Sequence, residues 1–388
     1  MSIRNSASIV GAFEHPTREA PDKSLAQLHG EVADGALEDA GLSQEDVDGF
    51  ITAEGPGVIS LADYLGLDGL SYVDSTDIGG ASYVAHVAHA ASAIATGKCE
   101  VVLITLAGRP RSATESGHPR RDYQEQAPEA GFEDVFGAST VGMYALAAKR
   151  HMHEYGTTPE QLAEIRVAAS EHAQYNNNAM FQDPVTVADV VESRLVSDPL
   201  HLLDCCVISD GGGALVVVSP EIERGLDRDG VNVLGYGESP KLHDGGNIDL
   251  TYTGARWSGP RAFAEAGVDH DDIDYASIYD SFTITVLETI EDLGFCRKGK
   301  GGEFVAEGAL KAPDGQLPFN TDGGGLCNNH PSNRGGMTKV LEAVRQLRGE
   351  ANPEVQVSGC DIALAHGTGI SLGTRHGSAT LILGGEAQ

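Results

Sequence analysis

The feature that most constrains the fold of this chain is an internal repeat. Four segments of the first half return in the same order in the second half. Paired in chain order, these segments are ALEDAGLSQEDVDGF at 36–50 with AFAEAGVDHDDIDYA at 262–276, STDIGG at 75–80 with NTDGGG at 320–325, CEVVLITLAG at 99–108 with CDIALAHGTG at 360–369, and GGGALVVVS at 211–219 with HGSATLILG at 376–384. Short motifs rarely keep a common order by chance, so the sequence predicts two halves built on one plan.

Each half has the sequence pattern of an α/β unit. The first repeated segment combines the end of an amphipathic helix, a glycine stop and an acidic turn with the start of a strand. Runs such as VVLI and LVVV are apolar on both faces, which indicates strands that are buried on both sides. The predicted fold class is therefore α/β, with helices covering a sheet in each half.

The spacing of the paired segments indicates where the halves differ. It widens along the chain and then contracts at the last pair, which predicts an insertion at about 109–205 in the first half. We therefore expect an N-terminal half at 1–220 and a C-terminal half at 221–388. The inserted segment contains helical patterns and few strand signals, so we expect a lid or a substrate-binding excursion over the first half.

Composition excludes several classes of protein. The chain has 57 acidic and 26 basic residues, a formal net charge of −31, which would repel nucleic acid and an anionic membrane surface. No apolar run approaches the roughly 18 residues of a membrane span, and the N-terminus has no apolar signal-peptide core. The six cysteines show no CxxC spacing, which favours reduced thiols in a cytoplasmic protein.

Four polar stretches are candidates for a functional site. If the halves pack about a pseudo-twofold axis, equivalent turns and strand ends face each other, and a ligand site between them is expected. The stretches that would converge there are Asp77 in the first glycine turn, Tyr279-Asp280-Ser281-Phe282 after the strand predicted at 273–278, Asn329-His330-Pro331 after the second glycine turn, and His366-Gly367-Thr368-Gly369 after the strand predicted at 361–365. His86 and His89 share a predicted helix, but two histidines make no metal site without further ligands, so no metal is expected.

These motifs resemble those of the thiolase superfamily, and more narrowly of its sterol-carrier-protein-type, or lipid-transfer-protein, branch. The resemblance rests on the duplicated halves and on LLDCCVISDGGGALVV at 202–217, YDSFT at 279–283, NTDGGGLCNNHP at 320–331, EAVRQLRG at 342–349 and the closing HGTG. It implies a thiolase fold, with two α/β halves packed as α-β-α-β-α layers. It also implies an acyl-CoA substrate with no other bound cofactor, a homodimer and, as in some members of the branch, a small zinc-ribbon/OB-fold partner subunit.

The resemblance also identifies where this chain departs from the family. The nucleophilic cysteine of the family, in the pattern Cys-x-Ser-Gly, falls on Asp77. The second reactive cysteine, in the pattern Cys-x-Gly-x-Gly, falls on the loop beginning at His366. The Asn/His-Glu-x-Phe motif falls on 279–282 and the Gly-His-Pro motif falls on 329–331. Both reactive cysteines are therefore replaced.

The chemistry that remains is that of an aldolase. Without a thiolate no acyl-cysteine can form, whereas retro-aldol cleavage or aldol formation of a β-hydroxyacyl-CoA needs only acid/base groups and donors for an enolate. We expect Tyr279 or His330 to remove the β-hydroxyl proton. We expect His366 to protonate the enolate carbon and Asp280 to orient a neighbouring group. The residues expected to contact substrate, through a glycine-turn backbone or beside it, are Asp77, Gly324, Gly325 and Gly369.

The resemblance supports this direction and leaves the base open. Some members of the branch that lack the cysteine look like retro-aldolases acting on the side-chain CoA thioesters of steroids. Those members have a tyrosine at the position of Tyr279 and commonly a second tyrosine where this chain has His330. The base is therefore either Tyr279 or His330.

Other interpretations remain open on the sequence alone. Asp77 can cap the following helix, Tyr279 can simply end a strand, and Cys327, three residues before His330, is expected to serve packing. The alternative enzyme is a thiolase or acetyl-CoA acyltransferase with altered catalytic residues. The alternative outside catalysis is a silent thiolase-fold subunit that holds a partner or a lipid.

Overall fold

The computed structural model describes residues 2–53, 55–115, 139–242, 247–331, 335–372 and 376–385. The elements of the N-terminal half are β1 (Ser8–Glu14), α1 (Leu25–Ala40), β2 (Gly49–Ile51), α2 (Val58–Leu65), β3 (Tyr72–Asp74), α3 (Ser82–Ala95), β4 (Val101–Gly108) and β7 (Gly211–Val218). The segment between β4 and β7 contributes α4 (Pro110–Glu115), α6 (Thr140–Tyr155), α7 (Pro159–Ala173), α8 (Val187–Glu192), β5 (Leu195–Ser197) and β6 (Leu200–His201).

The second half follows the same plan after the short helix α9 (Pro220–Glu223). Its elements are β8 (Val231–Lys241), α10 (Ala255–Ala266), β9 (Tyr275–Ile278), α11 (Thr283–Leu293), α12 (Gly301–Ala306), α13 (Gly324–Cys327), α14 (Gly336–Arg348), β10 (Ile362–Ile370) and β11 (His376–Gly384). In order and type, β1, α1, β2, α3, β4 and β7 correspond to β8, α10, β9, α14, β10 and β11. The predicted duplication is confirmed.

The repeat extends to local detail at the turn that follows the first helix of each half. Helix α1 ends at Gly41 (φ 69°) and α10 ends at Gly267 (φ 66°), both in the left-handed region that glycine adopts at little cost. Each glycine leads into a 3₁₀ turn that ends in an aspartate, Asp46 or Asp272, whose carboxylate accepts from the backbone N–H of the residue just before the turn. The same acidic turn thus delivers the chain into β2 and into β9.

Nine of the described strands form one sheet, in the order β3-β2-β4-β7-β1-β8-β11-β10-β9, and β5 and β6 form a separate two-stranded sheet. In each half a parallel pair (β2 with β4, β9 with β10) is followed by antiparallel neighbours. The two halves meet where β1 pairs with β8, at Ser8 opposite Asn232. The two sets of five and four strands therefore share one continuous ladder.

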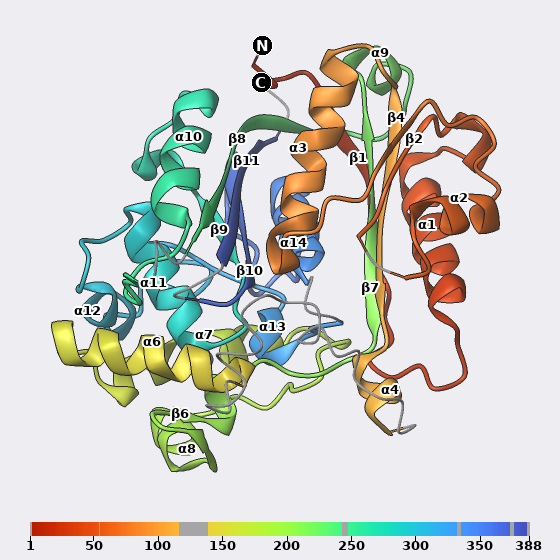
Figure 1. Ribbon diagram of the computed structural model, residues 1–388. Coiled ribbons are helices and arrows are strands. Elements are labelled where there is room, and N and C mark those ends of the chain that lie inside the picture. The colour runs from red at the N-terminus through yellow and green to blue at the C-terminus, as the bar shows by residue number, and fades with distance from the viewer. Residues whose placement is uncertain are drawn as a thin grey trace.

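Three apolar cores divide this architecture into layers. One core surrounds α3 and α14, which lie between the strands of the two halves (Figure 1). A second packs α1 and α2 on the outer face of the first half, and a third packs α10 and α11 on the outer face of the second. The layers run helix, sheet, helix, sheet, helix, as expected from the thiolase fold.

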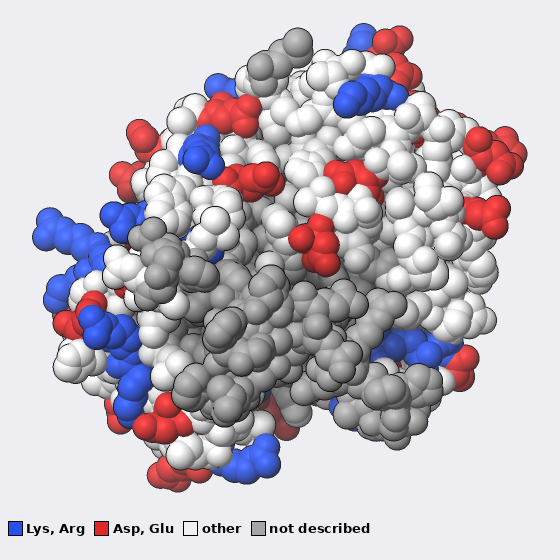
Figure 2. Space-filling model, in the orientation of Figure 1, with Lys and Arg blue, Asp and Glu red and all other residues white. Residues whose placement is uncertain are grey.

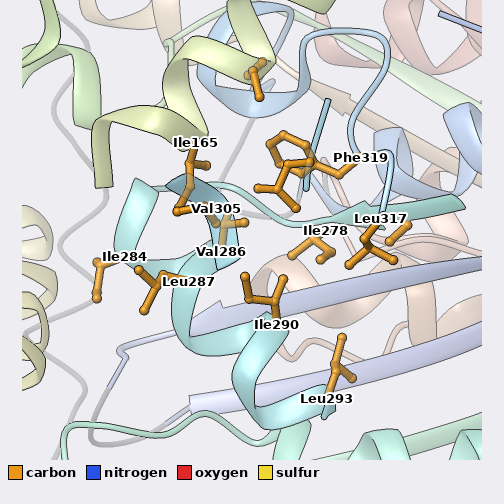
Figure 3. Packing of buried hydrophobic residues seen from close by; sticks show 14 of the residues in the cluster. Ile165, Ile278, Ile284, Val286, Leu287, Ile290, Leu293, Val305, Leu317 and Phe319 are labelled. Carbon is orange, nitrogen blue, oxygen red and sulfur yellow. The ribbon is translucent and has the colours of Figure 1, made fainter. Parts of the chain in front are cut away.

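Helices α6 and α7 of the insertion pack on the second half of the molecule, whereas α4 is bonded to Asp210 beside β7 of the first half. Ile165 of α7 lies among the apolar side chains of α11 and α12, including Val286 and Val305 (Figure 3), and α7 also contacts α13. The expectation that the insertion covers the first half is therefore wrong for 139–205. The apolar face of α7 packs on the C-terminal half. The residues that follow β9 and those around α13 belong to the same half.

Charged side chains are spread over the surface of the described residues. On the face shown in Figure 2, basic side chains gather mainly on the side of α6 and α12, whereas acidic side chains are scattered. Within the described ranges, every helix is too short or too polar to cross a membrane. The same ranges contain no group of three or more His, Cys, Asp or Glu side chains placed to hold a metal ion.

Candidate active site

The centre of the candidate site is a hydrogen bond between a phenol and an imidazole. Tyr279 is the first residue after β9, and its hydroxyl lies 2.7 Å from Nε2 of His330, which follows α13. The two rings meet edge to face, with centroids 5.5 Å apart. The backbone N–H of His330 donates to the Ser209 hydroxyl at 2.9 Å, which holds the main chain of this residue in place. The structure thus brings together two of the predicted residues.

Burial keeps both partners of this pair uncharged at neutral pH. It raises the pKa of the Tyr279 phenol well above 10, and the nearby groups Cys206 and Tyr144 act in the same direction. Burial lowers the pKa of His330 from 6.5 to about 4, although the Asp280 carboxylate opposes this shift. A neutral imidazole can accept a proton at Nε2, so the phenol can pass its proton to His330 when it takes one from elsewhere.

Asp280 is fully engaged in a buried ion pair. Its Oδ1 lies 3.0 Å from Nζ of Lys339 on α14, and both side chains are almost completely buried. The same carboxylate accepts from the backbone N–H groups of Gly325 at 2.8 Å and Leu326 at 3.0 Å. Burial alone would lower the pKa of Lys339, but the charge of Asp280 raises it. Asp280 therefore ties the start of α13 to α14, an arrangement that suits the predicted orienting role.

The second glycine turn does not offer free amides to a substrate. The N–H of Gly325 donates to Asp280, and the N–H of Gly324 donates to Asp322 Oδ1 at 2.9 Å. Gly324 has φ 61°, and a Cβ there would lie 2.2 Å from an Asp280 oxygen. The backbone N–H groups of Gly324 and Gly325 are therefore engaged within the protein, and the predicted contact of these glycines with a substrate stays a prediction. These glycines let the chain fold tightly around a carboxylate of the protein itself.

The first glycine turn lies against Tyr279 through its backbone. Asp77 is exposed, and its Oδ1 accepts from the N–H of Gly79 at 3.0 Å, a local bond that shapes the turn. Helix α3 begins later, at Ser82, whose hydroxyl accepts from the turn. A Cβ on Gly80 would lie 2.5 Å from the Tyr279 ring, so only glycine leaves room for the phenol.

Gly369 brings the end of β10 against the same turn. A Cβ there would lie 1.9 Å from the carbonyl oxygen of Ile78 and within 3 Å of Gly79 and Gly80. The missing side chain therefore allows two backbone segments to touch. The position of Gly369 beside the turn agrees with the sequence, but its contacts are with the protein, and a substrate contact stays a prediction.

His366 lies on the opposite face of the sheet from Tyr279. It pairs in register with Ile278 and Thr380, and its Nδ1 lies 2.8 Å from the Thr380 hydroxyl, which also bonds Ser258 of α10. The imidazole is completely buried under α10 and α11, and burial lowers its pKa to about 3. The prediction that His366 joins Tyr279 and His330 is wrong, because a strand presents successive side chains to opposite faces.

A shift of one residue explains the error. The spacing Cys-x-Gly-x-Gly fits 365–369, which places Ala365 at the position of the cysteine. Ala365 belongs to the core around α3, and a Cβ on Gly367 would lie 2.8 Å from Ala81 at the start of that helix. The side of β10 that faces the first glycine turn thus carries only small residues and no acid or base.

The insertion contributes a tyrosine that sequence reasoning missed. Tyr144 on α6 is 3% exposed, and its ring packs on Phe282 with centroids 4.4 Å apart. Tyr144 also interacts electrostatically with Tyr279 and Cys206. In the sequence Tyr144 is one apolar position of an amphipathic helix, and nothing in that pattern separates a pocket tyrosine from a packed one.

No cysteine is poised to replace the lost nucleophile. All six cysteines are free, and burial raises the pKa of each thiol, for Cys327 to about 12. Cys327 is fully buried in the core around α11, as the sequence predicted. Cys206 lies closer to Tyr279, yet it too is a thiol at neutral pH. The nucleophile of covalent catalysis is a thiolate, so an acyl-cysteine is disfavoured here.

A carboxylate from the first half holds the segment before the imidazole. Glu14 on β1 accepts from Arg18 at 2.7 Å and from Arg345 at 2.9 Å, and the Asn329 side-chain amide also donates to it. Burial raises the pKa of Glu14, but the two guanidinium groups outweigh this effect and lower it. Glu14 is therefore a charged anchor directly beside His330.

Comparisons with known proteins agree with this geometry. The family described as "Thiolase C-terminal domain-like" matches residues 240–385. The chain is 35% identical over 401 residues to a steroid side-chain-cleaving aldolase of Thermomonospora curvata, with 99% of each chain covered. It is 33% identical to a 17-hydroxy-3-oxo-4-pregnene-20-carboxyl-CoA lyase of Mycobacterium tuberculosis, covering 95% of this chain and 98% of the relative.

A thiolase-type relative and a solved structure support the same family. An acetyl-CoA acetyltransferase of Methanothermobacter thermautotrophicus is 33% identical, with 95% of this chain and 97% of the relative covered. The structure of an Ltp2-ChsH2(DUF35) aldolase superposes with a TM-score of 0.89 at 32% identity, covering 100% of this chain and 99% of the other. The chain therefore belongs to the thiolase superfamily, in the sterol-carrier-protein-like branch that includes CoA-thioester aldolases.

Proposed function

We propose that the protein is a carbon–carbon lyase that cleaves β-hydroxyacyl-CoA thioesters by a retro-aldol reaction, or forms them in the reverse direction. The observation that carries this proposal is the neutral Tyr279–His330 pair in a site where no thiol is ionised. Such a pair can move a proton, and proton movement is what aldol chemistry requires.

In this proposal the Tyr279–His330 pair acts as the base. The phenol takes the proton of the substrate β-hydroxyl while passing its own proton to Nε2 of His330. The β-carbon becomes a carbonyl, the bond between the α- and β-carbons breaks, and its electrons move into the thioester enolate. The Asp280 carboxylate favours the imidazolium that forms, because it raises the pKa of His330.

The relatives suggest the substrate class. The names of two relatives describe cleavage of a steroid side chain and a hydroxylated steroid carboxyl-CoA. We propose that this chain also acts on a β-hydroxyacyl-CoA whose β-carbon belongs to a bulky, ring-containing acyl group.

The test is to incubate the protein with 17-hydroxy-3-oxo-4-pregnene-20-carboxyl-CoA and to follow the ketone and the shortened acyl-CoA by mass spectrometry. Replacing Tyr279 by Phe should lower kcat by about 10²- to 10⁴-fold, the usual contribution of a positioned acid or base. Tyr155→Phe, at the partly exposed end of α6, is the matched control and should leave kcat unchanged. Full activity of the Tyr279→Phe variant would contradict the assignment.

A second candidate is an acyltransferase with altered catalytic residues, which the similarity to an acetyl-CoA acetyltransferase favours. The two candidates differ in one intermediate, because an acyltransferase of this superfamily passes through an acyl-enzyme. Incubation with a labelled acyl-CoA followed by intact-protein mass spectrometry separates them. An acyl-enzyme that forms and is then consumed during turnover would contradict the aldolase proposal and support the acyltransferase.

We also propose that the protein assembles as a homodimer and works with a small partner subunit. Strand β3 lies at one edge of the nine-stranded sheet, and Val73 on it is 41% exposed, so a second copy could extend the sheet there. The partner is suggested by the name of the similar structure, an Ltp2-ChsH2(DUF35) aldolase. Light scattering of the chain alone tests the dimer, and co-expression with a DUF35-type protein followed by size exclusion tests the complex.

A further inference from the structure

The retro-aldol reaction needs an acid as well as a base, and the base pair does not supply it. After the carbon–carbon bond breaks, the enolate carbon must receive a proton. His366, the residue predicted for this step, lies on the other face of the sheet. The acid therefore has to come from another element that reaches the surroundings of Tyr279.

Tyr144 is placed to reach that space from the insertion. Its ring packs on Phe282, three residues after Tyr279, and the two tyrosines interact electrostatically. Its hydroxyl lies 3.4 Å from the carbonyl oxygen of Ile370, the last residue of β10. This distance is at the long limit for an O–H···O bond, so the hydroxyl can leave this contact for a better acceptor at little cost.

Two groups near the Tyr144 phenol favour its phenolate form. Burial raises the pKa of the phenol to about 12, while the Ser281 side chain and the Leu372 backbone oppose this rise. Ser281 is in turn held by the hydroxyl of Thr285, 3.1 Å away. Groups that favour a phenolate are what a phenol needs when it gives up its proton.

The residue that accepts the Tyr144 hydroxyl is in a strained conformation. Ile370 has φ 68°, in the left-handed region that a β-branched side chain rarely adopts. Its side chain is 57% exposed, so apolar burial does not hold it in place. Its backbone nitrogen lies close to Gly79, within 2.7 Å of where a Cβ on that glycine would be. Such strain is typical of functional sites, and here it sets a carbonyl between the first glycine turn and Tyr144.

We propose that Tyr144 is the acid that protonates the enolate carbon, on the basis of its buried position against Phe282, close to Tyr279, and of its long contact with the Ile370 carbonyl oxygen. This rests on the proposed retro-aldol function. The Tyr144 O–H bond breaks and a C–H bond forms at the α-carbon, which yields the shortened acyl-CoA. The Tyr144 phenolate then regains a proton from the Tyr279–His330 pair, in which the imidazolium gives up the proton that it received from Tyr279. No proton or electron is gained or lost overall.

The experiment separates bond cleavage from protonation by rapid quenching in a single turnover. In Tyr144→Phe the ketone should form in the first turnover at a rate within about tenfold of the unmodified protein, because Tyr279 and His330 are intact. The steady-state rate should fall by about 100-fold, since enolate protonation is slowed. The result is a burst of ketone followed by slow turnover. Tyr279→Phe should instead slow both phases equally and show no burst.

A second variant and a control keep the test decisive. Ser281→Ala removes a group that favours the phenolate and should give a smaller effect in the same sense, a burst with a steady-state rate lowered by about tenfold. Tyr155→Phe, on the same helix, should behave as the unmodified protein. A loss of both phases in Tyr144→Phe, with an unchanged melting temperature, would show that Tyr144 is needed for bond cleavage and not for protonation, and would overturn the proposal. Absence of ketone from the unmodified protein would instead overturn the proposed function.

Discussion

The two glycine turns occupy equivalent places in the two halves and contribute different things to the site. The first, at 75–80, presents backbone: Gly80 makes room for the Tyr279 ring, and the Asp77 carboxylate is exposed and bonded within the turn. The second, at 320–325, is buried and wraps around the carboxylate of Asp280. The first turn thus contributes mainly the shape of its backbone, whereas the second contributes buried polar contacts.

The largest expected effect on stability comes from the buried ion pair between Lys339 and Asp280 beside the second turn. Lys339→Met leaves the Asp280 charge unpaired in the interior and should lower the free energy of unfolding by about 3–5 kcal/mol. Urea unfolding followed by circular dichroism measures it. Adding Asp280→Asn to the same chain should recover part of the loss, because the orphaned charge is then removed.

The matched control is Lys300→Met, which breaks an exposed pair with Glu303. Exposed ion pairs contribute less than about 1 kcal/mol, so this variant should unfold almost like the unmodified protein. Equal losses in the two lysine variants would mean that the second turn does not depend on a buried charge, and the contrast between the turns would disappear.

An effect of intermediate size is expected when the pH is changed, because His330 lies beside the second turn and no histidine lies in the first. The His330 imidazole beside the second turn has its pKa lowered to about 4 by burial, so kcat/KM should stay within about twofold from pH 7 to pH 5 and fall near pH 4. The folded pKa lies below the unfolded value of 6.5, so the unfolded chain binds more protons between these values. Stability should therefore fall with pH below 6.5, by at most about 1.4 kcal/mol per pH unit from this group.

Circular dichroism at each pH separates the two effects, because it reports the folded fraction while initial rates report the chemistry. An acid limb of kcat/KM near 6.5 in protein that is still folded would place a solvated histidine, and not His330, in the reaction.

The smallest expected effect is at the first turn. Asp77→Asn keeps an oxygen that can accept from the Gly79 N–H, so the melting temperature should change by less than about 2 °C, in line with an ordinary surface substitution. Activity should stay within about threefold. A loss comparable to that of Tyr279→Phe would show that the first turn still carries chemistry, and the two halves would then share the reaction.

The fold could be predicted from the sequence because the repeat consists of short local patterns that mark where helices end and strands begin. Gly41 and Gly267 stop equivalent helices, and the acidic turns after them lead into equivalent strands. The position of the insertion was also visible, but its packing partner was not. The apolar face of α7, with Ile165, shows only that the helix is covered, and both halves offer an apolar surface.

The site could be predicted only where the spacing was unambiguous. Tyr279 and His330 are 51 positions apart in the chain and yet bonded, and the motifs around them indicated this. His366 was assigned to the wrong face because a one-residue shift in a strand reverses the direction of the side chain. Lys339 and Tyr144 were missed, since a buried lysine and a pocket tyrosine look like ordinary positions of amphipathic helices.

The contact made by Glu14 means that the two halves cannot evolve independently of each other. This residue lies 315 positions before Asn329, in the other copy of the repeat, yet its carboxylate binds the amide next to the imidazole. Once such a contact exists, neither copy can change freely, because a substitution in one must suit a partner in the other. A gene split between the copies would part Glu14 from the amide that it anchors.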